Sequence, residues 1–312
     1  MSGKAVDTRI AALRRFAASI TVFTIAGAFF LSFEDSWAQP VVAMLTCYLL
    51  DLALETLDAR CTGRPPRYAG GPKALVDYLL PAHITALSIA LLLYPNSRLQ
   101  PIVFACAVAV GSKFVFQAPV GGRRRHFLNP SNFGIAVTLL AFPWVGISPP
   151  YQFTEGVSGI WGSGVFGWLV PAGVLVSGTA LNAKLTGKMP LILGWLGAFV
   201  AQALVRAAVF GTPLVAPLLP VTGLVFVLYT NYMITDPGTT PVVRRNQVAF
   251  GTATALVYGV LVSLHVVFGL FFALAIVSAA RGVGLYALAA WAAARARRAP
   301  EPAPADLGVA RL

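Results

Sequence analysis

Apolar runs of about 20 residues recur along the whole chain and constrain its fold more than any other feature. A helix needs about 20 apolar residues to cross the hydrocarbon core of a bilayer. Charged residues make up only 11% of the sequence, too few to cover a water-exposed surface. We therefore predict an all-α polytopic membrane protein with about ten transmembrane helices. The predicted spans are 16–34, 38–57, 75–94, 99–119, 128–147, 164–185, 189–209, 214–235, 246–265 and 269–292.

Most Lys and Arg residues fall in alternate loops between these runs and at the two ends of the chain. This is the pattern of the positive-inside rule, so we expect both termini in the cytoplasm. The net charge of +12 would suggest nucleic acid in a soluble protein, but here the topology explains it and no nucleic-acid partner is expected. The predicted organisation is a basic cytoplasmic N-terminus (1–15), one transmembrane domain (16–292) in the lipid bilayer, and a disordered cytoplasmic tail (293–312).

Acidic residues inside the apolar runs are candidates for function, because charges are costly in a membrane. Asp51, Glu55 and Asp58 recur at helical spacing and share one face. They sit where a helix C-terminus disfavours anions, so they need basic partners such as Lys113 or the run 123–125. Either they form a structural ion network, or they line an ion or proton path together with a weaker candidate, Asp77.

Two Asx-Pro pairs predict helix N-termini on the cytoplasmic side. Asn129-Pro130 and Asp236-Pro237 each fit an N-cap followed by proline at the first helical position. Both motifs are explained by capping alone, but two helix N-termini facing one region would also form an anion or phosphate site. The candidate binding residues are Asn129, Asn132, Thr235, Asp236, Thr239 and Thr240.

The same two motifs carry a family resemblance. "NPSNFG" at 129–134 and "YMITDPGTTP" at 232–241 resemble the signatures of a membrane-subunit family shared by the sodium-pumping NADH:quinone reductase and the Rnf electron-transport complex. "TGKMPLILGWLGAF" at 186–199 is similar to a third family stretch, and the resemblance covers roughly 15–290. It implies a fold of two inverted five-helix repeats, similar to urea transporters, in the bacterial cytoplasmic (inner) membrane.

The resemblance also implies an FMN attached to a threonine in an outside loop, but this chain departs from that motif. The loop reads "EGVSGIW", with Ile160 and Trp161 where the family has alanine and the acceptor threonine. Tryptophan has no hydroxyl to form the phosphoester. Thr179, in "VSGTAL", has a hydroxyl but lies toward the cytoplasmic end of the span 164–185, which is the wrong side for attachment in an outside loop. Covalent FMN is therefore not expected. Trp161 either anchors the loop at the interface or stacks on a planar ligand.

Three functions stay open on this basis, and the sequence does not settle whether the chain is an enzyme. The first is an electron-transport subunit with a noncovalent flavin (FMN or riboflavin) or quinone, working with other membrane or redox subunits and coupled to an ion. The second is a transporter or channel for a small solute or biosynthetic product. The third is a membrane scaffold for soluble biosynthetic enzymes. The chain resembles a divergent branch of the family that occurs in bacterial natural-product (enediyne-type) biosynthetic clusters. No metal site or Ser/His/Asp arrangement is predicted, since His83, His126 and His265 lie far apart.

Overall fold

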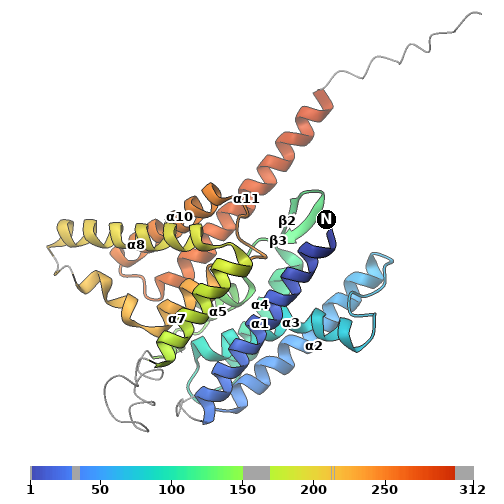
Figure 1. The fold of residues 1–312 in the computed structure, drawn as a ribbon, viewed down its shortest axis with the longest axis horizontal. Coiled ribbons are helices and arrows are strands. Elements are labelled where there is room, and N and C mark those ends of the chain that lie inside the picture. Colours follow the sequence, from blue (N-terminus) through green and yellow to red (C-terminus); the bar gives the residue numbers. More distant parts are fainter. Residues whose placement is uncertain (1, 30–35, 150–168, 212, 214, 299–312) are drawn as a thin grey trace, which may run out of the picture.

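The chain is mainly helical over the residues that the computed structural model describes, which are 2–29, 36–149, 169–211, 213 and 215–298 (Figure 1). The part before residue 150 holds five α-helices and two small antiparallel sheets. These elements are α1 (Ser2–Phe29), α2 (Ala38–Cys61), α3 (Pro72–Leu92), β1 (Leu93–Tyr94), α4 (Gln100–Val115), β2 (Gln117–Val120), β3 (Arg123–His126), α5 (Pro130–Ala141) and β4 (Gly146–Ile147).

The part after residue 168 is helical but more irregular. Two of its helices end in a π-helical turn, and a 3₁₀ segment precedes one of them. Its elements are α7 (Leu169–Leu181), the π-helix η3 (Asn182–Thr186), α8 (Met189–Phe210), the 3₁₀-helix η4 (Ala216–Thr222), α9 (Leu224–Leu228), the π-helix η5 (Tyr229–Met233), α10 (Arg244–Ser263) and α11 (Gly269–Arg298).

Prolines mark the starts of four helices. Pro72, Pro101, Pro130 and Pro190 lie in the first turns of α3, α4, α5 and α8. Proline fits there because its fixed φ suits a helix and its missing N–H would have no intrahelical partner in that turn.

The two sheets lie at opposite ends of the helices. The β2–β3 hairpin follows α4 and turns through Gly121 and Gly122, whose φ angles of 57° and 76° suit a type I′ turn. Tyr286 of α11 donates a hydrogen bond to the Gln117 carbonyl and holds the hairpin against α11. At the other end of α4, β1 pairs with β4 and joins the end of α3 to the segment after α5.

The predicted multi-pass membrane architecture is confirmed, but the predicted number of spans is not. Helical structure lies within every predicted run. Among the described residues, five helices are long and apolar enough to cross a membrane, or six if a pair bent by 74° counts as one span. They are Ile10–Phe29, Ala38–Cys61, Pro72–Leu92, Met189–Phe210 and Gly269–Arg295, with the bent pair at Ala216–Thr222 and Val225–Met233. Their exposed apolar side chains place the protein in a lipid bilayer.

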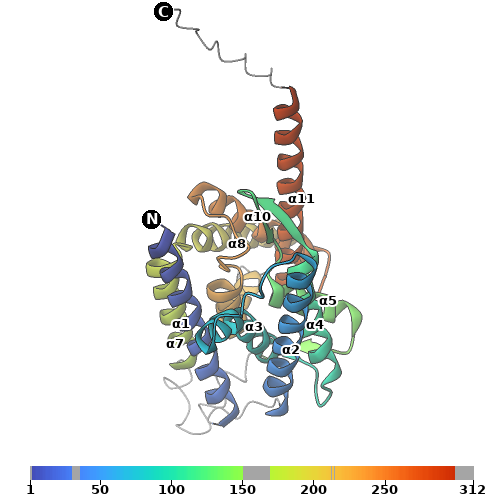
Figure 2. The same cartoon turned by 90° about the vertical axis from the view of Figure 1, so that its right-hand side faces the viewer.

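The two ends of the described chain lie on the same side of the bundle, where α11 extends well beyond the other helices (Figure 2). Residues 293–298 belong to α11, so the prediction that the disordered tail begins at 293 is wrong. The alanines there are strong helix formers and simply continue the helix. The rest of the predicted tail lies outside the described residues.

Candidate functional site

The stretch after η5 folds as a tight turn built around Asp236. The Asp236 Oδ1 accepts a hydrogen bond from the backbone N–H of Gly238 at 3.0 Å, and Oδ2 accepts one from the Thr239 hydroxyl at 2.8 Å. The Thr240 hydroxyl donates to the Asp236 carbonyl at 2.6 Å. Asp236 therefore orders the turn with its side chain and its main chain together.

This turn corrects one prediction. Pro237 does not begin a helix, since the next helix, α10, starts at Arg244 with Val243 as its N-cap. An aspartate that bonds to the N–H two residues later favours a turn over a helix. The second helix N-terminus expected to help bind an anion is therefore absent from the Asp236 turn.

The predicted helix cap at Asn129 is confirmed, and Asn129 also joins the two motifs. Its Oδ1 accepts from the N–H of Asn132 at 3.0 Å, which caps α5, with Pro130 in the first turn. Its Nδ2 donates to the carbonyl of Met233 at 2.9 Å. The start of α5 and the Asp236 turn are thus held together by one buried side chain.

Most predicted binding side chains point into the protein. Thr235 is fully buried and donates to the Asn231 carbonyl at 2.7 Å. Asn132 is 1% exposed and donates to the Phe271 carbonyl at 3.0 Å, while its Oδ1 has no hydrogen-bond partner among the described residues. The six candidate residues thus lie in one region, but most of their side chains already form hydrogen bonds with other groups of the protein.

Two cations hold the turn from other elements. The Lys188 Nζ donates to the carbonyl of Pro241 at 2.7 Å, and the Arg281 Nη1 donates to the carbonyl of Thr239 at 2.8 Å. Lys188 is 3% exposed. Burial lowers the pKa of Lys188 to about 8; Asp236 opposes this shift, and Arg281 adds to it. This site consists of the Asp236 turn, Lys188 and Arg281. It holds two cations and one carboxylate, so its net charge is positive.

Sequence reasoning missed these cations as site residues. Arg281 stood out as a charge in the last apolar run, and Lys188 as a loop residue before Met189-Pro190. Lys188 lies in the stretch 186–199 that resembles the family, but nothing in that stretch connects it with Asp236, because both cations reach the turn from distant segments. The signal in the sequence was a basic side chain inside an apolar run for Arg281 and just before one for Lys188.

Glycine fits the tip of the turn because space there is limited. A Cβ on Gly238 would lie 3.3 Å from the Asp236 Oδ1 and 3.5 Å from the Nε2 of His126. His126 ends strand β3, so the basic hairpin also approaches this turn. Gly238 thus allows the Asp236 turn and the hairpin to lie close together.

A pair of π-helices, which the sequence did not suggest, adjoins the turn. The Asn182 Nδ2, in η3, donates to the carbonyl of Asn231, in η5, at 2.7 Å. Gly178 makes this approach possible, since a Cβ there would lie 2.6 Å from the Asn231 Cβ. π-Helical turns are frequent at functional sites. Thr179 donates to the Asn231 Oδ1 at 3.4 Å and so belongs to this contact.

The predicted ion-path residues lie away from this site, and each has a basic partner. The Lys113 Nζ lies 2.8 Å from the Asp51 Oδ1, as predicted. Glu55 pairs with Arg64 and Arg67 of the α2–α3 loop. These three ion pairs form a polar network near the C-terminal end of α2.

The two other acidic residues, Asp58 and Asp77, are also paired with arginines. Asp58 also pairs with Arg64, so the alternative partners predicted at 123–125 are wrong for Glu55 and Asp58. Asp77 pairs with Arg14 of α1 at 2.7 Å. The α2–α3 loop supplies the partners of Glu55 and Asp58 because it folds back over the C-terminal end of α2.

Among the described residues, no group of three or more His, Cys, Asp or Glu side chains could hold a metal ion. The flavin-attachment motif, including Ile160 and Trp161, lies outside the described residues. The arrangement around Asp236 brings the positive charges of Lys188 and Arg281 to one turn. No protein-family model matches this chain, and no curated protein matches it.

Proposed function

We propose that this chain is an electron-transport subunit resembling the corresponding membrane subunit of the Rnf complex, with a noncovalently bound flavin or quinone in the bacterial inner membrane. The observation that carries the proposal is the Asn129–Met233 hydrogen bond, which joins the two motifs of the resemblance. Lys188 and Arg281 add positive charge to the same place, which suits the phosphate of FMN.

The helix contacts support the proposed two five-helix repeats. In the first half, α1 contacts α3, α2 contacts α4, and α4 contacts α5. In the second half, α7 contacts α9, α8 contacts α10, and α10 contacts α11. These three contacts recur at matching places in the two halves, whereas the contacts of α3 with α2, α4 and α5 belong to the first half. Because five is an odd number of spans, two such repeats in one chain have opposite orientations, which gives ten spans and both termini on one side. The positive-inside pattern makes that side the cytoplasm.

The proposed flavin is held without a covalent bond, and the protein works with further redox subunits and a coupling ion. The test is an absorbance spectrum of the protein purified in mild detergent. We expect flavin absorbance that is lost from the protein after denaturation and filtration, with no fluorescent protein band on a denaturing gel. The released compound is then identified as FMN or riboflavin by chromatography.

Matched variants tie the flavin to the site. Lys188→Met should reduce the bound flavin, whereas Lys184→Met, which removes an exposed lysine of η3 four positions earlier, should not. Folded wild-type protein without a chromophore, together with solute flux in proteoliposomes, would instead establish a transporter. Retention of soluble enzymes through the basic loops, with neither chromophore nor flux, would establish a scaffold.

A further inference from the structure

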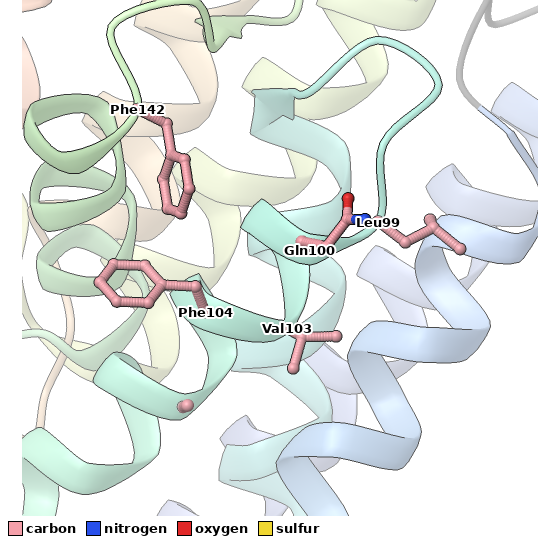
Figure 3. Close-up of a pocket in the computed structure, with 6 residues that line it drawn as sticks. Leu99, Gln100, Val103, Phe104 and Phe142 are labelled. Carbon is pink, nitrogen blue, oxygen red and sulfur yellow. The ribbon is translucent and has the colours of Figure 1, made fainter.

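An apolar groove runs along α4 at the end of the bundle opposite the basic loops (Figure 3). Its volume is about 630 Å³, and it is lined by Leu99, Gln100, Val103, Phe104, Ala107 and Phe142. Gln100 is the one polar residue of this lining. The Phe104 and Phe142 rings form one wall, edge to face with centroids 5.3 Å apart.

The groove belongs to the outward face of α4. The inward face carries fully buried residues such as Ile102, Ala105 and Cys106. The lining residues of α4 recur three and four positions apart on the other face, where Val103 is 42% exposed. α4 is a shorter apolar helix of 16 residues. In the proposed ten-span arrangement it lies in the bilayer, where its outward face contacts lipid chains, so the occupant of this groove comes from the bilayer.

A cation lies next to the lining residues of the groove. Arg98 directly precedes the lining residue Leu99, and its guanidinium lies 4.8 Å from the ring centroid of Trp144. Trp144 in turn packs edge to face on Phe142, with centroids 5.8 Å apart. Tryptophan and arginine at the end of an apolar segment are typical of the membrane–water interface.

We propose that this groove binds one acyl chain of an anionic phospholipid, whose phosphate pairs with Arg98. The apolar lining matches the chain, and Arg98 places a positive charge at headgroup level. Cation–π contact with Trp144 uses the face of the guanidinium and leaves its N–H edges for phosphate oxygens. The site lies away from the Asp236 turn and does not depend on the proposed redox function.

The test compares lipids with identical chains and different headgroups. The full-length protein is delipidated in detergent, and binding of phosphatidylglycerol and phosphatidylcholine is measured by native mass spectrometry. We expect wild type to prefer phosphatidylglycerol by about fivefold, the size of one interfacial cation's attraction for an anionic headgroup. Arg98→Gln should abolish the preference and Arg98→Lys should keep it. Ala107→Phe, which fills the groove, should weaken binding of both lipids.

Arg124→Gln is the charge control, because Arg124 is exposed on the β2–β3 hairpin at the other end. It should leave the preference unchanged, and melting curves confirm that each variant is folded. Two results would overturn the proposal: an unchanged preference in Arg98→Gln, or wild-type binding of both lipids in Ala107→Phe. Inorganic phosphate at the same concentration should not displace the lipid, since it has no chain to bury.

Discussion

The side-chain amide of Asn129 reaches the carbonyl of Met233, 104 positions later in the chain, at 2.9 Å. The same side chain caps α5 through its oxygen. One residue therefore starts a helix in the first half of the chain and fixes the segment that leads into the Asp236 turn of the second half. This makes the two roles of Asn129 separable by substitution.

Asn129→Ser should keep the cap and lose the link to Met233, because a serine hydroxyl caps well but is too short to replace the amide. Asn129→Ala should lose both. We expect the alanine variant to be less stable than the serine variant by about 1 kcal/mol, the usual worth of a cap. Thermal melting in detergent measures both. Equal stabilities would show that the cap contributes nothing here.

The cap at Asn129 could be predicted because it is local: the Asn-Pro pair and the apolar run that follows suffice. The Asp51–Lys113 pair could also be predicted, since an acid buried in a membrane helix requires a cation. Both predictions depend on a strong physical demand that few residues can meet.

The Asp236 turn could not be predicted from the Asp-Pro pair alone. Helix capping and turn formation use the same first residue, and Gly238 with Thr239 decides in favour of the turn. Lys188 and Arg281 were missed because their partners are backbone carbonyls, which leave no mark in the sequence. Only the packing of distant segments brings them together.

Asp51→Asn should destabilise the protein by about 3–5 kcal/mol, because it leaves Lys113 charged and unpaired beside a buried position. The double variant Asp51→Asn/Lys113→Gln should recover most of this loss. Asp77→Asn is the matched control: its partner Arg14 has a side chain 49% exposed, so the cost should be about 0–1 kcal/mol.

The double variant also separates the two interpretations of the acidic residues. If the acidic residues form only a structural ion network, the double variant should regain both its stability and its coupling to Na⁺ or H⁺. If stability returns while coupling to Na⁺ or H⁺ is lost, Asp51 belongs to an ion path. Denaturant unfolding and ion uptake in proteoliposomes, measured on the same preparations, distinguish these results.

The stability of the folded protein should rise between about pH 8 and pH 10.4 through Lys188. Burial lowers the pKa of Lys188 to about 8 in the folded state, whereas an unfolded lysine has a pKa of about 10.4. In this window the unfolded state holds more protons, so the free energy of unfolding increases with pH. The difference between wild type and Lys188→Met isolates this contribution from other titrating groups.

The same titration should act on anion binding in the opposite sense. Deprotonation of Lys188 removes a positive charge beside Asp236, so bound FMN should decrease as the pH rises through about 8. Titration of flavin retention in wild type and Lys184→Met should show this midpoint. Flavin retention that is independent of pH would place the phosphate elsewhere.

Gly251 should be the most sensitive position of the α8–α10 contact. A Cβ there would lie 2.4 Å from the Leu191 carbonyl oxygen and 2.7 Å from the Trp195 nitrogen, so the two helix backbones would have to separate. Small residues allow such close approach between membrane helices. Gly251→Ala should therefore cost about 1–3 kcal/mol, as overpacking does in well-packed cores.

Gly197 on α8 provides the control for that substitution, because a Cβ there meets no atom within 4 Å. Gly197→Ala should stabilise the helix by up to about 1 kcal/mol, since alanine loses less backbone freedom than glycine. Melting temperatures of the two variants should therefore move in opposite directions. If Gly251→Ala has the same melting temperature as wild type, then α8 and α10 do not approach closely at Gly251. The contact between α8 and α10 that supports the second five-helix repeat would then have to be withdrawn.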